Sequence, residues 1–142
     1  MLKGIPSILS PELLKILMEM GHGDSLVIGD GNFPGASMGP RLIRLDGPGT
    51  PEVLEAIRTL FPLDRYIEAP VKLMEVVPGD QVETPIWDIY RSITDKHAQG
   101  TRIGHAERFA FYDLARSAYC VIQTGESALY ANIWLQKGVV TA

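Results

Sequence analysis

The chain has 142 residues, 46% of them hydrophobic and 21% charged, a composition typical of one ordered globular domain. Its net charge is −4 and no run of basic residues occurs, so we expect no nucleic-acid partner. No apolar stretch approaches the ~20 residues that span a bilayer, and Pro6 interrupts any N-terminal signal sequence, so we expect no membrane partner.

The first predicted helix begins after Ser10 and ends at Gly21. Ser10 is a good N-cap, Pro11 suits the first helical position, and Glu12 faces the positive end of the helix dipole. Apolar residues then follow at helical spacing: Leu13, Leu14, Ile16, Leu17 and Met20. The helix leads into a glycine-flanked turn that carries His22.

After this turn, residues 26–28 form a short apolar run that predicts a strand buried on both faces. The strand ends at an acidic, glycine-rich loop that begins with Asp30 and continues to Pro40. Ligands of open α/β sheets bind where strands end. Asp30 is therefore a candidate ligand-binding residue, although an ordinary turn would also use an aspartate here.

Strands and helices alternate along the rest of the chain. We expect strands at residues 41–45, 71–77, 119–123 and 132–135, and helices that begin near residues 50, 84 and 109. This order predicts an α/β fold of one domain, residues 1–142, with a central, mostly parallel sheet covered by helices in three layers. The last two strands are candidates for a local pair. The lone Cys120 cannot form an internal disulfide and favours a cytoplasmic location.

The segment 35–39 matches the G-x-S-x-G pattern of serine hydrolases, with Ser37 in the nucleophile position. That motif requires a strand immediately before the serine and a helix immediately after it. Pro34 and Pro40 flank the segment, so we expect neither element and exclude Ser37 as a nucleophile.

The three histidines do not form a metal-binding pattern. His22, His97 and His105 are far apart, and none belongs to an H-x-x-x-H pair or joins a cysteine, so we predict no metal. No phosphate-binding glycine motif follows the first strand, and we predict no cofactor. His97 is expected on the surface, whereas surface and site roles stay open for His105. A structural turn and a functional site are both open for His22.

Two further segments add polar and aromatic groups. Arg108 opens a helix with an aromatic entry, residues 109–112, and Tyr130-Ala131-Asn132 precedes the last strand. Together with His22 and Asp30, these segments supply planar polar groups for hydroxyls and aromatic rings for an apolar sugar face. The set is typical of a carbohydrate site.

The ordered set of segments resembles the L-fucose mutarotase and D-ribose pyranase family of small bacterial sugar-binding enzymes. The matching segments are residues 10–14, 20–24, Asp30 with 33–34, 37–40, 108–112, 124–126, 130–133 and 137–139. The resemblance implies an isomerase that exchanges the anomers of an aldose, with His22 as the proton donor. It also implies that the sugar is contacted by Asp30, Arg108, Tyr130, Ala131 and Asn132, and that subunits assemble into ring-like decamers with sites near subunit boundaries.

The two branches of this family differ at a few positions. The segments 108–112 and 37–40 resemble the fucose branch, since ribose pyranases carry histidine where Arg108 stands. Ala131 is closer to the ribose branch, and Asp30-Gly31 departs from the more usual Asp-Ala. We predict L-fucose as the substrate, with a D-ribose pyranase and a non-catalytic sugar-binding or regulatory protein as alternatives.

The predicted positions of His22 and Asp30 raise a geometric problem. One strand separates the two residues, and from Asp24 to Asp30 it would span about 20 Å at roughly 3.3 Å per residue. Either the turn at His22 folds back over the strand, or a second subunit completes the pocket. The resemblance favours the second possibility, because it implies sites near subunit boundaries. We therefore expect a homo-oligomer in which the segment 130–132 of one subunit faces His22 and Asp30 of its neighbour.

Overall fold

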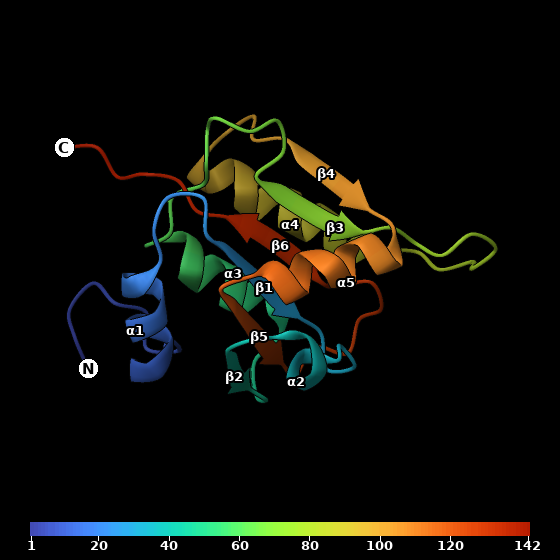
Figure 1. Cartoon of the computed structure of the whole chain (residues 1–142), viewed down its shortest axis with the longest axis horizontal. Helices are drawn as coiled ribbons and strands as arrows, with labels where there is room; N and C mark the ends of the chain where they lie inside the picture. The colour runs from blue at the N-terminus through green and yellow to red at the C-terminus, as the bar shows by residue number, and fades with distance from the viewer.

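The computed structural model describes all 142 residues and contains five helices and six strands (Figure 1). In chain order these are α1 (Pro11–Glu19), β1 (Ser25–Gly29), α2 (Gly35–Met38), β2 (Leu42–Leu45), α3 (Thr50–Arg58), β3 (Val71–Met74), α4 (Pro85–His97), β4 (Ile103–Ala106), α5 (Arg108–Ser117), β5 (Cys120–Thr124) and β6 (Ile133–Gln136). None of the helices is both long and apolar enough to cross a bilayer. The Ser10 hydroxyl caps α1 by accepting from the Leu13 N–H at 3.2 Å, as the sequence predicts.

All six strands form one mixed sheet in the order β2-β5-β1-β6-β3-β4. β5 lies parallel to β1 and β2, and β3 lies parallel to β4, whereas β6 is antiparallel to both β1 and β3. Five strands therefore run in one direction and β6 alone opposes them. The predicted local pair between the last two strands is wrong, because β1 lies between β5 and β6. The apolar run at 26–28 needs partners on both sides to be fully buried.

Helices cover both faces of the sheet, and the alternation of side chains along the strands divides the core in two (Figure 1). Leu26 and Ile28 of β1 pack with residues of α1, α3 and α4, whereas Val27 packs with residues of α5. β5 and β6 alternate in the same way. The domain is therefore a three-layer α/β sandwich with two apolar clusters.

Two elements were not predicted. β4 is an edge strand whose residues are half-buried or exposed, so it lacks the apolar alternation that identifies a strand. The expectation that no helix forms around Ser37 is wrong, because Ser37 lies in the four-residue helix α2. Pro34 precedes this helix, and at a helix N-terminus the backbone N–H that proline lacks would have no partner within the helix. β1 ends at Gly29, so no strand immediately precedes Ser37 and the hydrolase motif is still incomplete.

Helix α4 fixes the backbone of the segment that precedes β6. The buried Tyr90 hydroxyl donates to the Ala131 carbonyl at 2.5 Å and also contacts the Thr50 hydroxyl. Burial raises the pKa of Tyr90 well above its ordinary value, so the phenol keeps the proton that it donates. Trp87 donates from Nε1 to the Tyr130 carbonyl at 2.8 Å. Residues 130–131 are thus held by two side chains of one helix.

The substitution Tyr90→Phe tests this link. It leaves the buried Ala131 carbonyl without its donor, so we expect the free energy of unfolding to fall by about 1–3 kcal/mol. Tyr119→Phe is the control, because its hydroxyl bonds to Glu19 at 2.7 Å on the surface, and we expect a change within about 0.5 kcal/mol. Urea unfolding measures both, and equal losses in the two variants would contradict the proposed link.

Candidate functional site

A cleft of about 230 Å³ opens where the parallel strands end. Asp30 follows β1, Met74 ends β3, and Arg108 begins α5 just beyond β4; Asn132 precedes β6, which runs the other way. The lining residues are Asp30, Asn32, Phe33, Pro34, Met74, Val77, Asp80, Arg108, Tyr112, Leu129, Tyr130 and Asn132. We call this the carboxyl-edge cleft, and it brings together four of the six predicted site residues.

Asp30 and Asn132 lie side by side in one chain. The Asp30 N–H donates to the Asn132 side-chain oxygen at 2.8 Å, because the antiparallel pairing of Ile28 with Ile133 aligns the residues just beyond. The expectation that Asp30 and the segment 130–132 come from different subunits is therefore wrong. Burial raises the pKa of the Asp30 carboxyl, and the nearby N–H groups of Asn32 and Ala131 oppose this shift.

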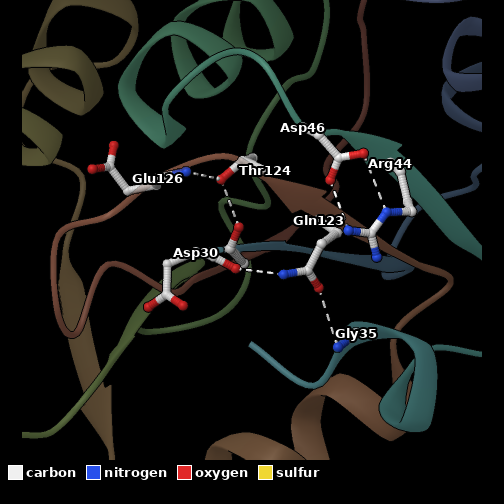
Figure 2. A network of polar contacts seen from close by, with 8 residues as sticks. Asp30, Gly35, Arg44, Asp46, Gln123, Thr124 and Glu126 are labelled. Atoms are coloured by element: carbon white, nitrogen blue, oxygen red, sulfur yellow. Dashed lines mark hydrogen bonds and ion pairs between the residues drawn. The ribbon is translucent and has the colours of Figure 1, made fainter. Parts of the chain in front are cut away.

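Figure 2 shows how the end of β5 holds the loop around Asp30. The Gln123 amide donates to the Asp30 carbonyl at 2.6 Å and accepts from the Gly35 N–H at 3.2 Å. The Thr124 hydroxyl donates to the Gly29 carbonyl at 2.8 Å (Figure 2). These contacts satisfy the backbone of the loop. The Asp30 carboxylate itself accepts from the Asn32 N–H at 2.9 Å and, as a group with two acceptor oxygens, can accept further hydrogen bonds from a ligand in the cleft.

Tyr130 is the one residue other than glycine with a positive φ, 55°. Such a conformation costs free energy and persists only where surrounding contacts impose it, as Trp87 does here. The Tyr130 hydroxyl donates to Asp80 at 2.6 Å, and this bond raises the pKa of Tyr130, so the phenol stays protonated at neutral pH. Ala131 is fully buried and does not line the cleft.

Arg108 is exposed at the start of α5 and has no carboxylate partner. Its Nε donates to the Tyr112 hydroxyl at 3.1 Å, and its guanidinium lies 5.5 Å from the ring centroids of Phe109 and Tyr112. The aromatic rings orient the guanidinium while its remaining N–H donors stay available to a ligand.

Sequence reasoning missed several residues of the cleft. Tyr112 could have been found, because it lies four residues after Arg108 on the same face of one helix. Phe33 packs edge-on against Tyr112, with ring centroids 5.9 Å apart, and the only sequence signal for it is its place in the segment 33–34 shared with the family. Asp80 lies in the long connection between β3 and α4, and no local pattern marks it.

His22 lies at the other end of the strands from the cleft, just before β1 begins. Its turn is fixed by Gly23, which has φ 88° and donates from its N–H to the Lys137 carbonyl at 2.9 Å. The imidazole Nε2 is 3.2 Å from the Asp64 carboxylate, and the ring centroid is 5.6 Å from that of Tyr66. The turn does not fold back over the strand, so within one chain His22 is outside the carboxyl-edge cleft.

The other two histidines also lie outside the cleft. His97 is 3.0 Å from Glu55, and His105 packs against Trp87 with ring centroids 5.0 Å apart. No group of three His, Cys, Asp or Glu side chains lies close enough together to hold a metal ion. A larger groove of about 890 Å³ runs past Asp64 and Tyr66, but it contains none of the six predicted site residues.

Comparison with known proteins gives close relatives over almost the whole chain. L-fucose mutarotase of Actinobacillus pleuropneumoniae is 49% identical over 140 residues, which cover 98% of this chain and 97% of the relative. The crystal structure of FucU from Bifidobacterium longum is 59% identical, covers 98% of this chain and 100% of its own, and has a TM-score of 0.95. The fucose mutarotase of Streptococcus pneumoniae in complex with L-fucose is 48% identical, covers 99% and 100%, and has a TM-score of 0.93.

A more distant likeness shows the fold alone: Bacillus subtilis RbsD complexed with D-ribose is 24% identical, with a TM-score of 0.72. Residues 3–140 match the model of the RbsD/FucU transport protein family. This match confirms the resemblance found in the sequence segments. The chain therefore belongs to the RbsD/FucU family.

Proposed function

We propose that the protein is a cytoplasmic isomerase that interconverts the α and β anomers of L-fucose. The observation that carries the proposal is the carboxyl-edge cleft, which combines Asp30, Arg108, Tyr130 and Asn132 in a volume suited to one monosaccharide. The near full-length similarity to fucose mutarotases supports the same reaction. The sugar needs no cofactor for anomer exchange, because the step is proton transfer with ring opening and closure.

The mixed lining of the cleft favours L-fucose over D-ribose. Asp30, Arg108 and Asn132 offer acceptors and donors for ring hydroxyls, while Met74 and Leu129 are apolar. L-fucose is a 6-deoxy sugar, so its methyl group would gain from apolar contact, whereas D-ribose has no such group. The more distant relationship to RbsD points in the same direction.

Anomer exchange requires two proton transfers. An acid gives a proton to the ring oxygen as its bond to C1 breaks, and the anomeric hydroxyl loses its proton to a second carrier; closure on the other face reverses both. We propose His22 as the acid, because imidazole can give and accept a proton near neutral pH. Tyr130 stays protonated, so it suits a donor better than a base. Tyr130 is therefore less suited to accept the anomeric proton, which leaves a water and His22 itself as the better candidates for the second carrier.

We propose that His22 reaches the cleft from a second copy of the chain. Apolar side chains are exposed at both places: Val77 and Leu129 line the cleft, and Phe109 follows Arg108 there, while Tyr66 packs against His22 and Val140 lines the same groove as Tyr66. Contact between two different edges is heterologous and generates a ring where the rotation closes. A decamer of the kind implied by the sequence resemblance is one such ring.

A non-catalytic sugar-binding protein is the second candidate, and the family description as transport proteins favours it. Such a protein would keep the cleft but would have no need of a protonatable group beside C1. NMR exchange spectroscopy on the α and β signals of L-fucose separates the two functions. D-ribose and L-galactose, which carries a hydroxymethyl in place of the methyl group, are measured beside it. Unchanged exchange for all three sugars would rule out the enzyme, and faster ribose exchange alone would reassign the substrate.

The role of His22 is tested by His22→Gln. We expect the exchange rate of L-fucose to fall at least about 100-fold, since acid–base assistance contributes about 10²–10⁴-fold, while sugar binding is retained. His97→Gln is the matched control and should exchange L-fucose at the wild-type rate, because His97 pairs with Glu55 outside the cleft. Wild-type exchange in His22→Gln would leave His22 as a structural turn residue.

Asp30→Asn should separate stability from binding. A pKa that is higher in the folded chain than in the unfolded chain means that folding favours the protonated acid. The favourable contribution of Asp30 is therefore present below about pH 4 and is lost as the pH rises through the raised folded pKa. At pH 7 we expect Asp30→Asn to raise Tm by up to about 4 °C. This increase in Tm should become smaller in acid, because the wild-type carboxyl is then protonated and uncharged as well.

The same variant loses a charged acceptor in the cleft, so half-saturation should require about 10–100-fold more L-fucose. Thermal unfolding at pH 7 and pH 3.5, together with NMR titration of the sugar, measures both effects. A lower Tm at pH 7 with unchanged binding would contradict both the electrostatic argument and the binding role.

Mixing two inactive variants tests the shared site. A His22→Ala chain lacks the acid, and a Tyr130→Ala chain lacks a cleft residue. In heterologous rings assembled at random from an equal mixture, about a quarter of the sites should combine an intact His22 from one chain with an intact cleft from its neighbour. Light scattering gives the mass of the assembly, and NMR exchange gives the recovered activity. A fully active monomer would rule out the shared site, as would mixed rings that recover no activity.

A further inference from the structure

Asp64 contacts His22 at the edge of the sheet far from the carboxyl-edge cleft. The Asp64 side chain is only 4% exposed, whereas the His22 side chain is 44% exposed, and the Nε2 to Oδ1 distance is 3.2 Å. The two residues are 42 positions apart, so the contact is tertiary. A buried carboxylate thus lies behind an accessible imidazole.

The carboxylate is held from several sides. Its Oδ1 accepts from the Tyr66 N–H at 2.9 Å, and its Oδ2 accepts from the Gln136 amide at 2.9 Å. The Asp64 N–H donates to the Gln136 carbonyl at 3.0 Å, so the backbone is fixed to β6 as well. The Tyr66 N–H, followed by Gln136 and His22, lowers the pKa of Asp64, which keeps the group ionised at neutral pH.

An ionised carboxylate can only accept hydrogen bonds, so the nitrogen that faces it must carry a hydrogen. His22 Nε2 faces Asp64, and the ring is flanked by Tyr66 on another side. The neutral imidazole therefore carries its hydrogen on Nε2 and has a free lone pair on Nδ1. When Nδ1 gains a proton, the ring becomes a cation beside a fixed anion.

We propose that Asp64 is a positioning residue for His22: it fixes the Nε2–H tautomer and leaves Nδ1 as the atom that exchanges a proton with the sugar. This inference rests on the proposed acid–base role of His22. Asp64 lies behind the imidazole, so it acts on the reaction only through the ring, by orientation and by charge.

Asp64→Asn is the direct test, because asparagine can still accept from the Tyr66 N–H but has no charge. We expect the exchange rate at saturating L-fucose to fall at least about ten-fold, since loss of the carboxylate beside a catalytic histidine can cost far more. The half-saturating concentration should stay at the wild-type value, because the cleft is untouched. Asp64→Glu should recover part of the rate by restoring the charge.

Glu55→Gln is the matched control. Glu55 also pairs with a histidine nitrogen, His97 Nε2 at 3.0 Å, but neither residue lines the cleft or forms a hydrogen bond with His22. It should leave both the saturating rate and the half-saturating concentration unchanged. A wild-type rate in Asp64→Asn, beside a slow His22→Gln, would overturn the role of Asp64 alone. A wild-type rate in His22→Gln would instead overturn the role of His22.

Nitrogen-15 NMR of the wild-type chain gives a readout that depends on neither folding of a variant nor activity. In the neutral ring we expect Nε2 of His22 to have the nitrogen-15 chemical shift of a nitrogen that carries a hydrogen. Nδ1 should have the chemical shift of a nitrogen without one. The reverse assignment would overturn the proposal even if Asp64→Asn were slow or failed to fold.

Discussion

The antiparallel insertion of β6 between β1 and β3 is the constraint on which both functional edges depend. At the start of β6, Asn132 accepts from the Asp30 N–H and thereby forms the wall of the cleft. At its end, Gln136 donates to the Asp64 carboxylate, which in turn contacts His22. One strand thus fixes Asp30, the proposed sugar-binding carboxylate, at one end of the strands and His22, the proposed acid, at the other.

The cleft gathers groups that cost stability where they stand. Asp30 is a buried carboxylate with a raised pKa, and Tyr130 has a left-handed backbone. Both are held by rigid neighbours. Gln123 at the end of β5 fixes the Asp30 loop (Figure 2), and Trp87 of α4 donates to the Tyr130 carbonyl. Unfavourable local terms are tolerated because the two apolar clusters of the sheet supply the stability.

The distance between the cleft and His22 within one chain is the reason for the proposed assembly. If the proposed sugar contacts and the proposed acid lie about 20 Å apart in one chain, as the length of the strand between them implies, that chain cannot use both on one small ligand. A heterologous ring solves this geometry at every interface with the same contact. Activity would then depend on assembly, and the exposed apolar residues at both edges would be covered by the neighbour.

The sequence alone determined the features that depend on near neighbours. The Ser10 cap, the buried strand at 26–28 and the aromatic entry after Arg108 are local patterns, and the ordered segments identified the family. The position of β6, the edge strand β4 and the partnership of Asp30 with Asn132 were decided by tertiary structure. That last bond joins residues 102 positions apart, and a strand register set by burial of its apolar face cannot be read from spacing along the chain. The same holds for His22, whose partner Asp64 lies 42 positions away in a segment that is hydrogen-bonded to Gln136 at the end of β6.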